Sequence, residues 1–198
     1  MGTETAMIHT CTLNGLPLQT GDVICTKNGK PDILPGEFWR FIGRLVPGDV
    51  DHVAVYLGPG GRCVESGARG VSLYELPGER WDSEKMVLQR GLLLDEIVGV
   101  AYPLEGRGLL PEEQDHIRRE VADFLLAQVG KPYNLNFLDP DREDAYYCSQ
   151  LVYKAYLRNG IDLNTGLSIE TLPGANRIIY PQEVWSGCVN RAVPGNSN

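Results

Sequence analysis

The sequence predicts an α+β domain whose sheet is mainly antiparallel. Between residues 21 and 102, short β-like runs are separated by Gly, Pro and Asp, which is typical of consecutive strands. After residue 103, apolar residues recur instead at helical spacing in two segments. Strands come first and helices later, without βαβ alternation, so the helices are expected to pack on an antiparallel sheet.

The β-like runs bounded by Gly, Pro or Asp are predicted as strands: 22–26, 52–57, 62–66, 71–74, 86–89 and 98–102. A short helix at 36–41 is expected to carry aromatic residues into the core. Residues 1–17 and the last few residues show little pattern and are predicted to be loosely held.

Two longer helices are predicted in the second half of the chain. Pro111 occupies the favoured first position of one helix, which Gly130 ends. The other covers about 147–159, with Gly160 as its C-terminal stop. Their apolar stripes predict ordinary packing against the core.

Length and composition predict a single domain over 1–198, with a core at about 18–190. Eighteen Lys and Arg against 26 Asp and Glu give a net charge of −8. This balance argues against nucleic-acid binding, which depends on cationic contacts to phosphate. Apolar runs such as 91–94 are too short to span a bilayer and the N-terminus lacks a secretory pattern, so no membrane span and a cytoplasmic location are predicted.

The cysteines are odd in number and widely spaced: Cys11, Cys25, Cys63, Cys148 and Cys188. No CxxC pair occurs, so neither a zinc ribbon nor a thioredoxin-type site is supported, and no metal or organic cofactor is predicted. Most should be buried thiols, Cys25 and Cys63 among them, but one is a candidate nucleophile. The histidines that could assist it are few: His9, His52 and His116.

A hairpin through the turn at 58–61 predicts that His52 and Glu65 meet. Either a two-residue or a four-residue loop places Ala54 opposite Glu65, so that His52, Ala54 and Glu65 share one face. Glu65 is then diagonal to His52, about 7–8 Å away between backbones, a separation that a Glu side chain can bridge. A bulge at the glycines would overturn this assignment.

Cys148 supplies the remaining part of a nucleophilic triad. It lies in the first turn of the second predicted helix, where backbone N–H groups and the helix dipole stabilise a thiolate. His52 is then the base and Glu65 the group that fixes its tautomer. Each residue also has a structural reading: Cys148 as core, His52 as a satisfied strand residue, and Glu65 as a solvated edge residue.

Five runs of the sequence are informative together: "GDVI" (21–24), "DHVAVYLG" (51–58), "CVES" (63–66), "GKPYN" (130–134) and "YYCSQLVYKAY" (146–156). These runs resemble the YiiX/YebB-like proteins, the circularly permuted branch of the NlpC-type papain-like cysteine peptidases. In the permuted branch the His precedes the Cys, as His52 precedes Cys148 here. The resemblance implies a permuted papain-like fold with Cys148 as nucleophile, His52 as base and Glu65 as the polar third member. The chain has Asn134 and Gln150 where the family pattern often has Asp and Glu.

The resemblance implies a cysteine peptidase or amidase that cleaves amide bonds in small, possibly cell-wall-derived peptides. The alternatives are a lipid acyltransferase or thioesterase of the permuted papain-like type, and a non-catalytic binding module. The acidic run 139–144, if it borders the pocket, would attract a free amine on the substrate and repel phosphate head groups. Membrane binding is therefore not expected. Segments 75–84 and 164–179 are interpreted as surface loops, with lids or pocket walls as the alternative.

Overall fold

The structure is a computed structural model that describes residues 7–27, 48–91, 93–167 and 174–195. Its main sheet has the strand order β6-β5-β4-β3-β7-β8, and all neighbouring strands are antiparallel. The strands are β3 (Val23–Lys27), β4 (His52–Tyr56), β5 (Arg62–Gly67), β6 (Gly70–Glu75), β7 (Glu96–Tyr102) and β8 (Asn190–Ala192). The α+β class and the antiparallel sheet are therefore confirmed. The predicted helix at 36–41 lies outside the described residues.

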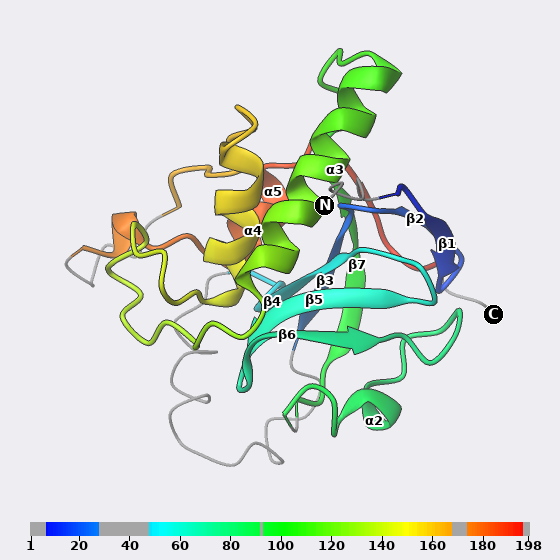
Figure 1. Cartoon of the computed structure of the whole chain (residues 1–198), viewed down its shortest axis with the longest axis horizontal. Coiled ribbons are helices and arrows are strands. Elements are labelled where there is room, and N and C mark those ends of the chain that lie inside the picture. Colours follow the sequence, from blue (N-terminus) through cyan, green and yellow to red (C-terminus); the bar gives the residue numbers. More distant parts are fainter. Residues whose placement is uncertain (1–6, 28–47, 92, 168–173, 196–198) are drawn as a thin grey trace, which may run out of the picture.

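Helices cover one face of this sheet, as Figure 1 shows for α3 (Pro111–Gln128), α4 (Cys148–Leu157) and α5 (Pro181–Ser186). Pro111 is the first residue of α3, as predicted. Valines of β3, β4 and β5 pack with α3 and α4 in the larger core cluster. The alternating residues, among them Ile24, Ala54 and Tyr56, point to the other face.

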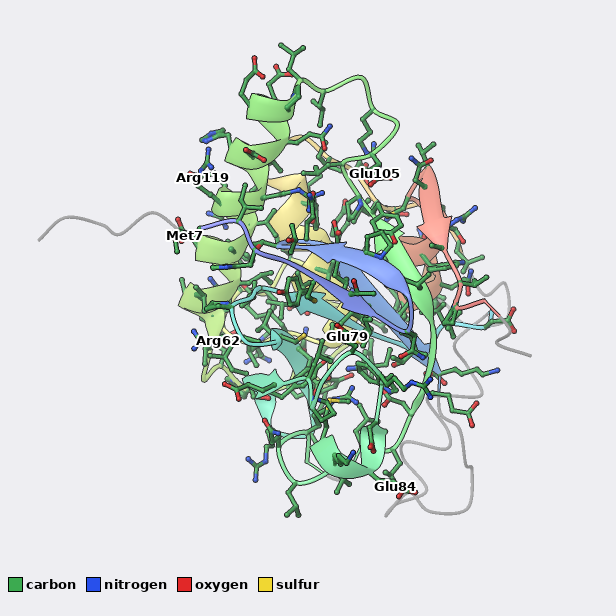
Figure 2. The ribbon with its side chains drawn as sticks, turned by 90° about the vertical axis from the view of Figure 1, so that its right-hand side faces the viewer. Met7, Arg62, Glu79, Glu84, Glu105 and Arg119 are labelled. Atoms are coloured by element: carbon green, nitrogen blue, oxygen red, sulfur yellow. The ribbon has the colours of Figure 1, made fainter. Side chains whose placement is uncertain are left out.

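A hairpin at the N-terminus covers part of that second face. It consists of β1 (Thr10–Leu13) and β2 (Leu16–Gln19), and Figure 2 shows it on the side of the sheet turned toward the viewer. Leu13 and Leu18 are completely buried in the smaller core cluster. The prediction that residues 1–17 are loosely held is therefore wrong from Thr10 onward. β1 contains two polar threonines and ends at the Asn14-Gly15 turn, so its sequence alone does not indicate a core strand. Only the burial of the hairpin against the sheet shows that it belongs to the core.

The predicted strand at 86–89 is also wrong. Residues Ser83–Met86 form the short helix α2, and turns follow it. Asp82 caps this helix by accepting a hydrogen bond from the Lys85 N–H (3.1 Å). Met86 is completely buried whereas Leu88 is 74% exposed. A run of three apolar residues is too short for its period to separate a helix from a strand.

Candidate active site

The hairpin between β4 and β5 has the register that the sequence predicts. Ala54 pairs with Glu65, Val55 with Val64, and Tyr56 with Cys63. The chain reverses through the turn at 58–61, where the Leu57 N–H donates to the Arg62 carbonyl (2.8 Å). Positive φ angles at the glycines of this turn require residues without a side chain. The register places His52 and Glu65 diagonally on one face.

His52 and Glu65 are in direct contact. The His52 Nε2 atom lies 2.8 Å from Glu65 Oε2, and both residues are buried. Since the ionised carboxylate only accepts hydrogen bonds, Nε2 is the protonated nitrogen of this contact. The other ring nitrogen, Nδ1, is therefore the one that can interact with a group other than Glu65.

Cys148 is the first residue of α4 and meets His52 at one end of the sheet. The thiol belongs to the core on the helix face, whereas His52 and Glu65 share the opposite face with Ala54. Where β4 begins, Cys148 lies close enough to His52 to act on its imidazole, because Cys148 is the largest influence that raises the pKa of His52. Ser66, near the end of β5, fixes this approach by donating to the Tyr146 carbonyl (2.6 Å).

The electrostatic surroundings keep His52 protonated at neutral pH. Burial by itself would lower the pKa of His52, but the hydrogen bond and charge of Cys148 and those of Glu65 raise it to about 10. A protonated imidazole in contact with sulfur stabilises the thiolate form of a cysteine. Cys148 and His52 are therefore a candidate nucleophile and a candidate acid.

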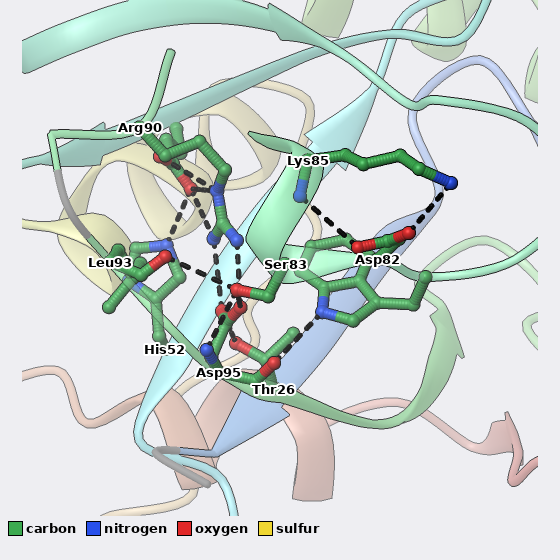
Figure 3. A network of polar contacts seen from close by, with 10 residues as sticks. Thr26, His52, Asp82, Ser83, Lys85, Arg90, Leu93 and Asp95 are labelled. Carbon is green, nitrogen blue, oxygen red and sulfur yellow. Dashed lines mark hydrogen bonds and ion pairs between the residues drawn. The ribbon is translucent and has the colours of Figure 1, made fainter. Parts of the chain in front are cut away.

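Glu65 stays ionised although it is buried. Burial disfavours its charge, but the Arg90 guanidinium and His52 outweigh burial and lower the pKa of Glu65 to about 2. Arg90 donates from Nη2 to Glu65 Oε2 (2.8 Å) and from Nε to both carboxylate oxygens (3.0 and 3.1 Å). Arg90 in turn contacts Asp95, so that a buried ionic chain runs from His52 through Glu65 and Arg90 to Asp95 (Figure 3).

Sequence reasoning missed Arg90 and Asp95. Arg90 follows the segment that was assigned to a strand, and Asp95 lies in the connection before β7. The pattern Arg-x₄-Asp carries no recognised signal, because the partner that gives it meaning, Glu65, is 25 residues away from Arg90 along the chain.

The other four cysteines differ from Cys148 in their surroundings. Cys25 and Cys63 are completely buried in strands, as predicted, and burial raises the pKa of both thiols. Burial also raises the pKa of Cys188, to about 12, and that of the partly exposed Cys11. Each of these four is therefore held as a neutral thiol at neutral pH.

The amides of Asn134 and Gln150 support the start of the helix that carries Cys148. Both side chains are completely buried, and Asn134 Nδ2 donates to Gln150 Oε1 (3.1 Å). The same Oε1 atom accepts from the Tyr147 N–H (3.1 Å), which caps α4 directly before Cys148. Gln150 Nε2 donates to the carbonyls of Pro140 and Arg142 (3.0 and 2.9 Å). This pair therefore ties the start of α4 to the acidic run.

Basic side chains from other segments offset the negative charge of the run 139–144. Asp141 lies 3.7 Å from Lys154 and 3.3 Å from Arg177, and Glu143 lies 3.7 Å from Arg158. Asp144 pairs with Arg142 inside the run. Three of the four acids in the run are thus paired with four bases. Once these bases are counted, the charge of the run does not favour a substrate that carries a free amine.

The two segments without a predicted role differ in structure. Residues 77–85 line a surface hollow of about 660 Å³ together with 94–97, and neither Cys148, His52 nor Glu65 lies in its wall. In the second segment, the Ile179 carbonyl accepts from Ser149 (2.7 Å) and its N–H donates to the Tyr147 hydroxyl (3.0 Å). Ala175 and Ile179 are buried, but residues 165, 166, 174, 176 and 177 are exposed, so the described part of 164–179 fits the interpretation as a surface loop that is anchored at its end. Residues 174–180 therefore pack beside the start of α4.

The described residues give no indication of a metal or a membrane span. No group of three or more His, Cys, Asp or Glu side chains in that part of the chain could hold a metal ion. None of the helices described there is long and apolar enough to cross a bilayer.

A buried Cys–His contact at the start of a helix, on an antiparallel α+β fold, is characteristic of papain-like cysteine enzymes. Residues 18–172 match the family described as permuted papain-like amidase enzyme, YaeF/YiiX, C92 family. The chain belongs to this family. No curated protein and no solved structure matches it.

Proposed function

We propose that the protein is a cysteine amidase or peptidase in which Cys148 is the nucleophile, His52 the acid and base, and Glu65 the residue that orients His52. The observation that carries the proposal is the position of His52, which contacts Glu65 through Nε2 and whose pKa is raised by the neighbouring Cys148. The family description, an amidase of papain-like type, supports the same reaction class.

The reaction would proceed through an acyl-enzyme. The Cys148 thiolate attacks the amide carbonyl carbon, and the oxyanion is stabilised by N–H groups at the start of α4, which have no partner in a preceding turn. The C–N bond breaks as the His52 imidazolium gives its proton to the leaving amine. Neutral His52 then takes a proton from water, which attacks the thioester. Release of the carboxylic acid restores the thiolate and the imidazolium.

The proposed substrates are small peptides, with cell-wall-derived peptides as one source. Since the charge of the run 139–144 is offset, the proposal rests on the amide bond and not on a free amine. The hydrolysis needs no group beyond the triad and water, so no cofactor is proposed.

One observation favours a lipid acyltransferase or thioesterase as the second candidate. Leu135 and Leu138 are 64% and 41% exposed on the segment that leads from Tyr133 toward the acidic run. This segment lies beside the start of α4, because the rings of Phe137 and Tyr147 are 5.4 Å apart. Two exposed leucines there could contact an acyl chain, whereas a small polar peptide would not need them.

We expect Cys148 to be the most reactive of the five thiols. Limiting iodoacetamide at about pH 6 should alkylate it first, because an imidazolium lies beside its sulfur, whereas burial raises the pKa of the other four thiols. Peptide mapping by mass spectrometry measures the order of labelling. Cys11 is the internal control, since it is more exposed than Cys148 but has no imidazolium partner in the described structure. Faster labelling of Cys11, Cys25 or Cys63 would contradict the assignment.

We expect the protein to hydrolyse short peptide amides and not to bind anionic vesicles. The net charge of −8 repels an anionic surface, and this repulsion is strongest at low salt. Co-sedimentation with phosphatidylserine vesicles at low salt measures binding. A panel of short peptides with free and blocked amino termini, assayed beside acyl thioesters, measures turnover. Vesicle binding together with turnover of the thioesters alone would instead support the acyltransferase candidate.

A further inference from the structure

The buried ionic chain that starts at His52 contains two charged residues outside the proposed triad, Arg90 and Asp95. Arg90 is 1% exposed and Asp95 5% exposed, and Arg90 shares the Oε2 atom of Glu65 with His52. Arg90 donates to Asp95 from Nη1 (2.7 Å) and from Nη2 (3.0 Å), in addition to its bonds with Glu65. Its guanidinium therefore spans two carboxylates.

Neutral contacts fix this pair in one arrangement. The guanidinium carbon lies 4.9 Å from the centre of the Tyr74 ring and 4.8 Å from that of Trp81. Asp95 accepts hydrogen bonds from Thr26 Oγ1 (2.7 Å) and from Ser83 Oγ (3.0 Å), as Figure 3 shows. These contacts surround Arg90 and Asp95 and leave the Arg90 side chain little freedom to rotate.

The net charge of Glu65, Arg90 and Asp95 determines how strongly the imidazolium of His52 is held. If only Arg90 faced Glu65, the two charges would cancel, and Glu65 would hold the imidazolium weakly. Asp95 adds a second negative charge, so that Glu65, Arg90 and Asp95 together carry one net negative charge. His52 also faces Cys148 from α4, its partner on β3 is the neutral Thr26, and Asp51 precedes it in the chain. The net negative charge of Glu65, Arg90 and Asp95 therefore acts on the imidazole of His52.

We propose that Arg90 and Asp95 are positioning residues for His52: Arg90 fixes Glu65 against Nε2, and Asp95 offsets the charge of Arg90 so that Glu65 acts on His52 as a full anion. This proposal rests on the proposed function. It assigns a role in catalysis to a segment outside the triad, and it does not require either residue to contact substrate.

The test follows the titration of His52 by NMR in the inactive Cys148→Ala protein, so it needs no substrate and does not depend on the reaction being correct. The protein has three histidines, and their signals are assigned by substitution. Adding Asp95→Asn should lower the pKa of His52 by on the order of one unit, because one negative charge is removed from the buried chain. Adding Arg90→Lys keeps the charge but loses the fork geometry, so neutral His52 should show a mixture of its two tautomers instead of the Nε2-protonated form.

Asp22 and Arg118 provide the matched control. They form a buried pair with a distance of 2.7 Å between Oδ1 and Nη1, at the other end of β3. Asp22→Asn and Arg118→Lys should leave the titration and tautomer of His52 unchanged. If Asp95→Asn and Arg90→Lys fold but give the same His52 spectra as these controls, the proposal is overturned. If both fail to fold while the controls fold, the pair serves the stability of the fold only, and the positioning role is likewise rejected.

Discussion

Cys148→Ala is expected to lower amide turnover by at least about 10³-fold, because the proposed acyl-enzyme forms on the Cys148 sulfur. The fold should be retained, since the substitution removes one sulfur atom at a helix terminus that is 6% exposed. Circular dichroism and thermal unfolding check the fold, and turnover of the best peptide in the panel measures the loss.

Cys25→Ala is the control for this prediction. Cys25 is completely buried in the same core cluster as Cys148, so its substitution carries a similar or larger packing cost. It should retain turnover. Activity that survives Cys148→Ala, or that Cys25→Ala abolishes in a folded protein, would show that the nucleophile has been misassigned.

Glu65→Gln is expected to affect both activity and stability. As the residue that orients His52, Glu65 should contribute roughly 10- to 1,000-fold to turnover. From the sequence alone, folding would be expected to remain intact. The structure changes this expectation, because the substitution leaves the buried Arg90 without one of its two carboxylates. Breaking one side of such a buried ionic contact costs about 3 kcal/mol.

The pH dependence of stability distinguishes this ionic role from simple packing. The pKa of Glu65 is about 2 in the folded protein, below its usual 4.5. Its contribution to the free energy of unfolding is therefore present above pH 4.5 and is lost as the pH falls from 4.5 toward 2. Urea unfolding should show wild type more stable than Glu65→Gln at pH 7, with the difference shrinking near pH 3.

Glu120→Gln, on the exposed surface of α3, is the control and should change stability little at either pH. A difference between wild type and Glu65→Gln that stays constant from pH 7 to pH 3 would contradict the ionic role. Unchanged turnover with Glu65→Gln would show that another group orients His52.

Local pattern was sufficient to predict the central part of the site. A glycine turn of fixed length determines the register of the hairpin through it, so the contact between His52 and Glu65 follows from counting residues. The position of Cys148 at the start of a helix follows from periodicity and from Gly160 at the end. Both inferences use only neighbours within one supersecondary unit.

The rest was decided by contacts between distant segments. Arg90 reaches Glu65 only because the turns after α2 bring it back to β5, and the charge of 139–144 is offset by Lys154, Arg158 and Arg177. Ion pairs of this kind have no periodicity, since their energy depends on burial and distance and not on spacing along the chain. The sequence by itself therefore determined the fold class, the hairpin register and the placement of the three proposed catalytic residues. Only the tertiary structure decided which charges surround them.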